Sequence, residues 1–282
     1  MTLLTLSQAL RQAESRGLDR LDAQWLLLHA LGKPTHERAW LLAHDTDQLP
    51  APVQAALDEG VLRRAAGEPL AYITGHQAFF GLDLQVDSRV LVPRPDTETL
   101  VEWALDVLQP QADAAPAVLD LGTGSGAIAL ALKATRPELR VSAIDYSTDA
   151  LAVAWTNAQR LALAVQFSQG AWLAALPRSS ACFHAIVSNP PYIAAQDEHL
   201  VALRHEPLQA LASGADGLDD IRQIITQAPA HLHPGGWLLL EHGYDQAATV
   251  RALLLQAGLE EVQSRRDLSG IERCSGGRRA QD

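Results

Sequence analysis

The sequence predicts an α/β protein in which a doubly wound sheet follows a small all-α helical domain. From residue 117 onward, short apolar runs of strand length alternate with longer segments whose apolar residues recur at helical spacing. Before residue 76, apolar residues recur at helical spacing and nothing alternates with a period of two. We therefore expect a helical domain over residues 1–75, a β-hairpin linker over 76–95, and an α/β domain over 96–282.

Composition and charge limit the classes of protein to which this chain can belong. Its 282 residues are 48% hydrophobic and 20% charged, which is typical of a soluble globular protein. A net charge of −11 argues against binding nucleic acid mainly through phosphate contacts, because such contacts rely on Lys and Arg. Cys182 and Cys274 lack metal-ligand spacing, so we expect no metal site and a reducing, cytoplasmic location. No signal pattern or bilayer-length apolar run is visible, so no membrane partner is expected.

Four apolar patches predict the helices of the region before residue 75. The first contains Leu6 and Leu10, with Ser7 as its expected cap. The third begins near Thr35, and the fourth is entered through Pro52. This region has no catalytic constellation, so we expect a substrate-recognition module.

The connecting segment predicts a strand pair and the start of a long helix. Phe79, Phe80 and the alternating residues 82–86 predict two strands around a turn, and residues 90–92 predict a further short strand. Asp96 is expected to cap a helix that runs from Thr97 to about Leu108.

The remaining chain predicts a regular alternation of strands and helices. Strands are expected over 117–121, 141–144, 165–167, 183–187, 237–241 and 259–264, with a last one starting at Ile271. Helices are expected over 127–135, 147–159, 219–231 and 244–256.

A glycine-rich turn after the first strand predicts a nucleotide-type site. Its residues are Gly122, Thr123, Gly124, Ser125 and Gly126. Glycine lets the backbone approach a ligand closely, and the start of the next helix offers free N–H groups. Asp145 ends the next strand 19 residues after Gly126, where a carboxylate can bind ribose hydroxyls.

The ligand of this turn is ambiguous from the turn alone. Gly122, Gly124 and Ala127 also satisfy the G-x-G-x-x-A form of a dinucleotide site. Asp120 argues the other way, because a carboxylate before the turn would repel a pyrophosphate and suits a cationic ligand such as S-adenosylmethionine. A turn or capping role is the alternative for Asp120.

The motif Asn189-Pro190-Pro191-Tyr192 predicts a rigid bracket at the end of the strand over residues 183–187. The prolines fix φ and remove backbone donors, and they push the preceding residue out of the helical region. In a doubly wound sheet this end of a strand faces the ligand crevice. An ordinary turn is the alternative for this motif taken alone.

The bracket suits chemistry on a planar –NH₂ group, whose delocalised lone pair makes it a poor nucleophile. The side-chain oxygen of Asn189 and the carbonyl of Pro190 can accept its N–H groups and favour a pyramidal nitrogen, while Tyr192 can stack on the planar group. Trp172 can stack on the adenine of a cofactor, although a core position fits it equally well. An amide and an adenine both carry such an –NH₂ group, so both remain open as the group modified.

Residues 118–126 together with Asn189-Pro190-Pro191-Tyr192 resemble class I, S-adenosylmethionine-dependent amino-methyltransferases. The sequence is more similar still to the HemK/PrmC family, the protein glutamine N5-methyltransferases that modify class I peptide-chain release factors. The resemblance covers nearly the whole chain and is weakest in the helical region. The supporting stretches are residues 67–75, 92–98, 188–193, 206–208, 210–211, 239–243, 266–267 and 272–273.

The resemblance implies a Rossmann-like methyltransferase sheet, S-adenosylmethionine as cofactor, and methylation of the glutamine in the release factors' Gly-Gly-Gln loop. It implies that Asn189 to Tyr192 hold the glutamine amide, with Asn189, Pro190 and Tyr192 acting in catalysis. In one departure, Ala171 stands where the family usually has an acidic residue, so one contact to the adenine amino group is missing or supplied by water. The cofactor contacts implied are Gly122, Thr123, Gly124, Ser125, Gly126, Asp145, Trp172 and Asn189.

Two other functions compete with this interpretation. A DNA or RNA adenine N6-methyltransferase uses the same bracket, but it would need a basic groove and a target-reading element, which the net charge of −11 does not favour. A binding module without activity is disfavoured by the intact Asn189 and both prolines. We therefore expect a release factor as partner, no direct contact with nucleic acid, and a monomer.

Overall fold

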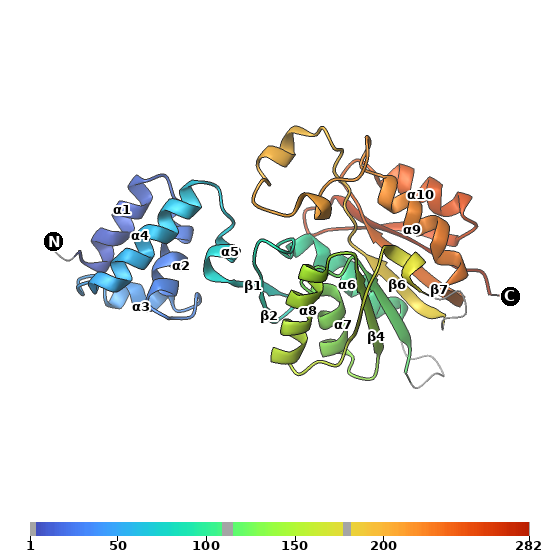
Figure 1. The fold of residues 1–282 in the computed structure, drawn as a ribbon, viewed down its shortest axis with the longest axis horizontal. Coiled ribbons are helices and arrows are strands. Elements are labelled where there is room, and N and C mark those ends of the chain that lie inside the picture. Colours follow the sequence, from blue (N-terminus) through green and yellow to red (C-terminus); the bar gives the residue numbers. More distant parts are fainter. Residues whose placement is uncertain (1–3, 109–114, 177–181, 282) are drawn as a thin grey trace. The chain divides into compact units, whose positions relative to one another are not determined.

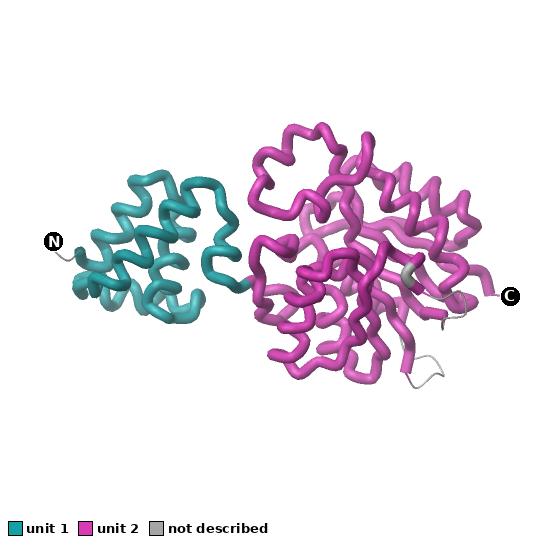
Figure 2. The backbone as a smooth tube through the Cα atoms, in the orientation of Figure 1, with its two compact units in different colours: residues 1–76 teal, residues 77–282 magenta. Residues whose placement is uncertain are grey.

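The computed structural model describes residues 4–108, 115–176 and 182–281 (Figure 1). The chain divides into two compact units, residues 1–76 and 77–282 (Figure 2). The first unit is helical and the second contains a seven-stranded sheet with helices, so the predicted fold class is confirmed. Within the described ranges, no helix has the length and apolar character needed to cross a bilayer.

The first unit is a bundle of short helices around a leucine-rich core. Leu26, Leu27 and Leu28 of the second helix are almost completely buried and pack with Leu6 and Leu57. These leucines come from separate helices, so one apolar cluster holds the bundle together. The helices are α1 (Leu6–Ser15), α2 (Arg20–Ala30), α3 (Arg38–Ala43), α4 (Ala51–Ala65) and α5 (Leu70–Thr74).

Three details of this unit differ from the sequence prediction. Thr5 rather than Ser7 caps α1, because its hydroxyl accepts from the backbone of Gln8 while the Gln8 side chain accepts from the Thr5 N–H. The third helix begins at Arg38, after a turn that includes residue 35. The fifth helix, α5, was not predicted, since five residues are too few to show a helical period.

The segment after the bundle forms the predicted hairpin, β1 (His76–Phe79) and β2 (Leu82–Gln85). The strand predicted over 90–92 is wrong: this stretch is irregular, and the Val92 N–H donates to the Glu206 carboxylate at 3.1 Å. A side chain thus takes the place that a neighbouring strand would fill. The predicted cap at Asp96 is also wrong, because Asp96 lies inside the 3₁₀ turn η1 (Pro95–Thr97) and approaches Arg273 at 3.5 Å.

The sheet of the second unit is mostly parallel and changes direction at one edge. Its strand order is β5-β4-β3-β6-β7-β9-β8, and β9 runs antiparallel to both of its neighbours. The inner strand β3 pairs with β4 on one side and with β6 on the other. The strands are β3 (Ala117–Leu121), β4 (Arg140–Asp145), β5 (Gln166–Gln169), β6 (Phe183–Ser188), β7 (Leu232–Glu241), β8 (Glu260–Arg266) and β9 (Glu272–Arg278).

Helices cover both faces of this sheet, as a doubly wound fold requires (Figure 1). Ile221 of α9 and Val250 of α10 share one cluster with Leu119 and Leu238, whereas Trp103 of α6 lies beside Leu239 and Gly276. Leu238 and Leu239 are neighbours in one strand and point to opposite faces. The helices are α6 (Glu98–Val107), α7 (Ala127–Thr135), α8 (Thr148–Arg160), α9 (Asp219–Gln227) and α10 (Ala247–Gln256), with 3₁₀ turns η2 (Trp172–Ala175), η3 (Glu198–Val201), η4 (Leu208–Ala210) and η5 (Ala228–Ala230).

This topology decides where a ligand can bind. The strands β3, β4, β5 and β6 are parallel, so their carboxyl ends meet at one edge of the sheet. Strand β3 has a neighbouring strand on each side. It therefore marks the switch point of the doubly wound sheet, where a crevice opens. The Ser188 hydroxyl donates to the Leu121 carbonyl at 2.7 Å and ties the ends of β3 and β6 together.

Candidate active site

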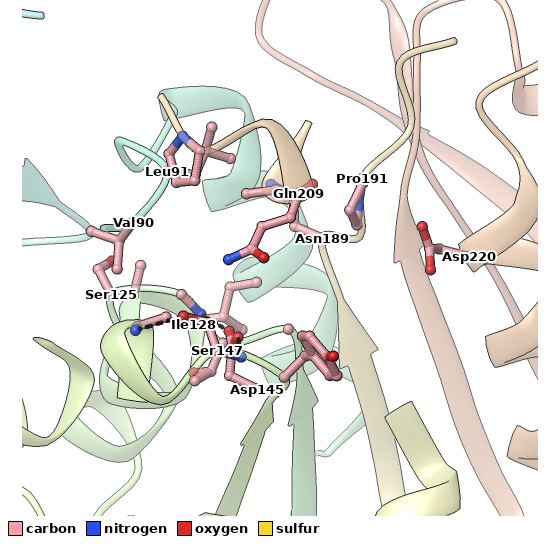
Figure 3. Close-up of a pocket in the computed structure, with 18 of the residues that line it drawn as sticks. Val90, Leu91, Ser125, Ile128, Asp145, Ser147, Asn189, Pro191, Gln209 and Asp220 are labelled. Carbon is pink, nitrogen blue, oxygen red and sulfur yellow. Dashed lines mark hydrogen bonds between the residues drawn. The ribbon is translucent and has the colours of Figure 1, made fainter. Parts of the chain in front are cut away.

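A cavity of about 370 Å³ lies at the carboxyl ends of β3, β4 and β6 (Figure 3). This size is typical of small-molecule and cofactor sites. The glycine turn contributes Gly122, Thr123, Gly124 and Ser125 to its lining. The predicted residues Asp145, Trp172, Asn189 and Pro191 line the same cavity. The structure therefore brings together residues that lie far apart in the sequence.

The glycine turn adopts a backbone that favours glycine at three positions. Gly122, Gly124 and Gly126 have φ values of +70°, +55° and +85°. A Cβ on Gly122 would lie 3.2 Å from the Trp172 ring, whereas a Cβ on Gly124 would meet no atom within 4 Å. The turn is thus closely packed at its first glycine and open at its second, so a ligand can approach the backbone there.

Asp120 supports the turn from inside the sheet. It is fully buried, and its Oδ2 accepts from the Thr123 hydroxyl at 2.7 Å and from the Ala129 N–H at 3.2 Å. Burial raises the pKa of Asp120 to about 7, although these two donors oppose the rise. The negative charge of Asp120, which would favour a cationic ligand, therefore depends on pH near neutrality.

Asp145 links the turn to the next loop. Its Oδ2 accepts from the Gly124 N–H at 2.8 Å, and its Oδ1 accepts from the Ser147 N–H at 2.9 Å. Burial raises the pKa of this carboxyl, and the backbone donors oppose that effect. Each carboxylate oxygen can accept a second hydrogen bond, so Asp145 retains capacity to bind hydroxyl groups in the cavity.

Trp172 lies between the core and the cavity. Its ring packs against the hydrophobic core and also lines the cavity, so both interpretations of Trp172 apply in part. Its backbone has a φ of +51°, which is unusual for a bulky residue and is found where the surrounding structure holds it. Its indole N–H donates to Asp220 Oδ1 at 3.0 Å, which fixes the ring plane.

The bracket places its amide in the cavity. The Asn189 side chain projects into the cavity from the end of β6 (Figure 3), and its Nδ2 donates to Thr97 Oγ1 at 3.2 Å. Pro190 and Pro191 are buried. The Tyr192 hydroxyl donates to Glu241 Oε1 at 3.2 Å, and the Tyr192 carbonyl accepts from Gln246 at 3.0 Å. Burial raises the pKa of the Tyr192 hydroxyl above its ordinary value, and the negative charge of the nearby Glu241 raises it further.

Several residues of this site have no role that the sequence alone reveals. Thr97 and Asp220 line the cavity, but both lie near the start of a helix, where such residues are common for local reasons. Glu206 accepts from the Val92 N–H and pairs with Arg94, which holds the segment before η4 against residues 92–94. The stretches around Arg94 and Glu206 carry family resemblance, and that was the only signal of their importance.

Comparisons with known proteins identify relatives of this chain over nearly its whole length. A family model described as the PrmC N-terminal domain matches residues 2–75, and a model described as the methyltransferase small domain matches residues 101–260. The release factor glutamine methyltransferase of Bordetella pertussis is 53% identical over 263 residues, which cover 93% of this chain and 95% of that protein. The release factor glutamine methyltransferase of Burkholderia pseudomallei is 50% identical over 269 residues, which cover 93% and 92%.

Solved structures support the fold at greater evolutionary distance. The catalytic domain of hMettl16 in complex with a MAT2A 3′UTR hairpin aligns with a TM-score of 0.58 at 17% identity, covering 78% of this chain and 80% of that one. Such a likeness shows the methyltransferase fold alone. The level of identity to the bacterial proteins shows more: this chain belongs to the family of release factor glutamine methyltransferases.

Proposed function

We propose that this protein transfers a methyl group from S-adenosylmethionine to the side-chain N5 of the glutamine in the Gly-Gly-Gln motif of class I peptide chain release factors. This reaction would support translation termination. The observation that carries the proposal is the Asn189 amide, which lies in the same cavity as the glycine turn and Asp145. The names of the bacterial relatives narrow the methyl acceptor to a release factor glutamine.

The residues of the cavity fit the proposed cofactor. S-adenosylmethionine, when bound, supplies a methyl group made electrophilic by its sulfonium. The open backbone at Gly124 and the helix start behind Gly126 would hold its polar chain, and Asp145 would accept from its ribose hydroxyls. Trp172 offers an aromatic face, and Ala171, which lines the same wall, leaves the adenine amino group without a carboxylate from that position.

The bracket would bind and orient the glutamine amide. Asn189 Oδ1 and the Pro190 carbonyl can accept the two N–H groups of the amide, which holds its nitrogen in one place and favours a pyramidal geometry. Tyr192 would support the planar group from one side. The nitrogen loses a proton readily once it is alkylated, so no strong base is required before transfer. Most of the rate would come from orientation and from fixed dipoles.

The first unit would serve as the recognition domain for the release factor. It matches the PrmC N-terminal domain and carries its own hydrophobic core. A cytoplasmic location, a monomeric state and the absence of direct nucleic-acid contact remain predictions of the sequence.

A labelling experiment tests the proposal directly. Purified protein is incubated with S-adenosylmethionine carrying a labelled methyl group, together with a release factor, the same release factor with Gly-Gly-Ala in place of Gly-Gly-Gln, or duplex DNA. We expect label in the first substrate alone. Label in the DNA but not in the release factor would favour the adenine methyltransferase alternative, and label in the Gly-Gly-Ala protein would move the modified residue elsewhere.

A further inference from the structure

A chain of polar side chains leads from the Asn189 amide into the interior of the sheet. Asn189 Nδ2 donates to Thr97 Oγ1 at 3.2 Å. The Thr97 hydroxyl lies close enough to the carboxyl group of Glu241 to lower the pKa of that group, and the Tyr192 hydroxyl donates to Glu241 Oε1 at 3.2 Å. These residues come from the turn before α6, from the loop after β6 and from the end of β7, so only the tertiary fold connects them.

The direction of each hydrogen bond follows from the chemistry of the groups. A carboxylate can only accept, and a threonine hydroxyl has one proton to donate. When Glu241 is ionised and takes the proton of Thr97, the Thr97 oxygen has only lone pairs left for Asn189. The Nδ2 of Asn189 is then the end of the amide that fits against Thr97, and Oδ1 is the end left for the cavity.

We propose that Thr97 and Glu241 are positioning residues, which fix the Asn189 side chain so that its oxygen and not its NH₂ group faces the methyl-accepting nitrogen. This inference rests on the proposed function. With the amide turned by 180°, an NH₂ group would face the NH₂ group of the substrate, and neither donor would have an acceptor. Buried donors without acceptors are costly, so the turned amide would not hold the substrate.

The surroundings of Glu241 make this arrangement sensitive to pH. Glu241 is buried, and burial raises its pKa to about 7, while Thr97, Tyr192 and the positive charge of Arg273 oppose the rise and Asp96 adds to it. Arg273 is itself shared with Asp96 at 3.5 Å and with Asp267 at 3.4 Å. Below about pH 7 a protonated Glu241 could donate, and Thr97 would no longer be forced to accept from Asn189.

A matched pair of Thr97 variants tests the proposal. Thr97→Ser keeps the hydroxyl and Thr97→Val removes it at nearly constant shape. We expect Thr97→Val to lower kcat on the release factor about 10-fold or more, and Thr97→Ser to stay within about threefold of wild type. The dissociation constant of S-adenosylmethionine, measured by calorimetry, should change less than threefold in both variants. Equal kcat values for the pair, or a loss confined to cofactor affinity, would overturn the proposal.

The pH profile supplies a readout that a structural role alone would not change. Wild type and Thr97→Ser should lose kcat as the pH falls through about 7, where Glu241 takes a proton. Glu241→Gln and Thr97→Val should lack this fall, because one has no titrating group and the other has no link to Asn189. Asp120 titrates in the same range and is intact in both variants, so a fall that persists in both belongs to Asp120 and contradicts the proposal.

The controls separate the two levels of the hypothesis. A wild-type protein that leaves the release factor unmethylated refutes the proposed function. An active wild type with indistinguishable Thr97 variants refutes only the positioning role. Circular dichroism melts show whether each variant is folded, and if Thr97→Val is not, the pH profile of Glu241→Gln decides the question alone.

Discussion

The glycine turn and the proline bracket leave adjacent strands of one sheet, yet they present opposite chemistry. The turn after β3 has positive φ at Gly122, Gly124 and Gly126, and it offers N–H donors at the start of α7. The bracket after β6 has prolines at two positions, so it lacks donors there and offers carbonyl and amide oxygens. Donors suit the polar chain and carboxylate of a cofactor, and acceptors suit the N–H groups of an amide.

A buried carboxyl group lies behind each of the two regions. Asp120 supports the turn and Glu241 lies behind the bracket, and burial raises the pKa of each to about 7. Each has one oxygen without a hydrogen-bond partner among the described residues. The difference between the regions therefore lies in the backbone that faces the cavity, while the support behind them is alike.

Asn189→Ala should have the largest effect of these changes, and it should reduce methyl transfer far more than cofactor binding. We expect methyl transfer to the release factor to fall by about 10³-fold, because an oriented acceptor for the substrate N–H is lost. Cofactor affinity should weaken by less than about 10-fold, since the turn and Asp145 are intact. Single-turnover kinetics and calorimetry measure the two effects. A rate near that of wild type would show that the bracket does not bind the reacting amide.

Gly122→Ala should have the opposite pattern. Its φ of +70° and a Cβ only 3.2 Å from Trp172 should strain the turn and displace the ring, which we expect to weaken cofactor binding about 10-fold or more. Gly258→Ala is the matched control for backbone strain, because its φ is +78°, its Cβ would meet no atom within 4 Å, and it does not line the cavity. Calorimetric titration with S-adenosylmethionine compares the pair. Equal losses would mean that packing against Trp172 does not shape the site.

Asp120→Asn should change how stability depends on pH. The folded-state pKa of Asp120, about 7, exceeds the ordinary value, so the folded protein binds the extra proton and the wild-type free energy of unfolding should fall as the pH rises from about 4 to about 7. The variant should lack this contribution and be more stable than wild type at pH 8, by on the order of 1 kcal/mol. Urea denaturation across this range measures it, with Glu241→Gln as the equivalent change behind the bracket. A steeper fall in the variant would contradict the assignment.

Ala171→Asp should have the smallest effect and should again concern the turn side. Residue 171 lines the cavity beside Trp172, and a carboxylate there can accept from an adenine amino group. One added hydrogen bond should tighten cofactor binding about 3- to 10-fold at constant kcat. Titration of both proteins with S-adenosylmethionine provides the comparison, and weaker binding would show that Asp145 or Asp220 repels a third carboxylate in this cavity.

The strands β3 and β6 could be predicted because each is a buried apolar run that ends in a turn signal. The run of residues 117–121 is an example, and the structure places β3 over these same residues. The same rule failed at residues 90–92, where Val90 and Val92 are buried without a neighbouring strand. There the backbone partner is the Glu206 side chain, 114 residues away, which no local pattern reveals.

The motif residues that line the cavity could be recognised in the sequence, whereas the residues that hold them in place could not. Glycine, proline and the carboxylate of Asp145 have motif spacing, so they can be recognised in the sequence. Thr97 and Glu241 have no such spacing, because a threonine before a helix and a glutamate at the end of a strand are ordinary. Both lie in stretches that resemble the family, 92–98 and 239–243, but the resemblance does not reveal which residues they contact. Their role follows from contacts with Asn189 and Tyr192 across the fold.

The antiparallel edge of the sheet has a consequence for the order in which the protein assembles. Among the described strands, β8 pairs with β9 alone. Strand β8 can therefore join the sheet only together with β9 or after it, and we expect the two to dock as one hairpin. Until then β7 is an open edge that can pair with another chain. Arg273 belongs to β9, and its positive charge acts on Glu241. The step that closes the aggregation-prone edge is therefore also the step that brings a positive charge to the buried carboxyl behind the bracket.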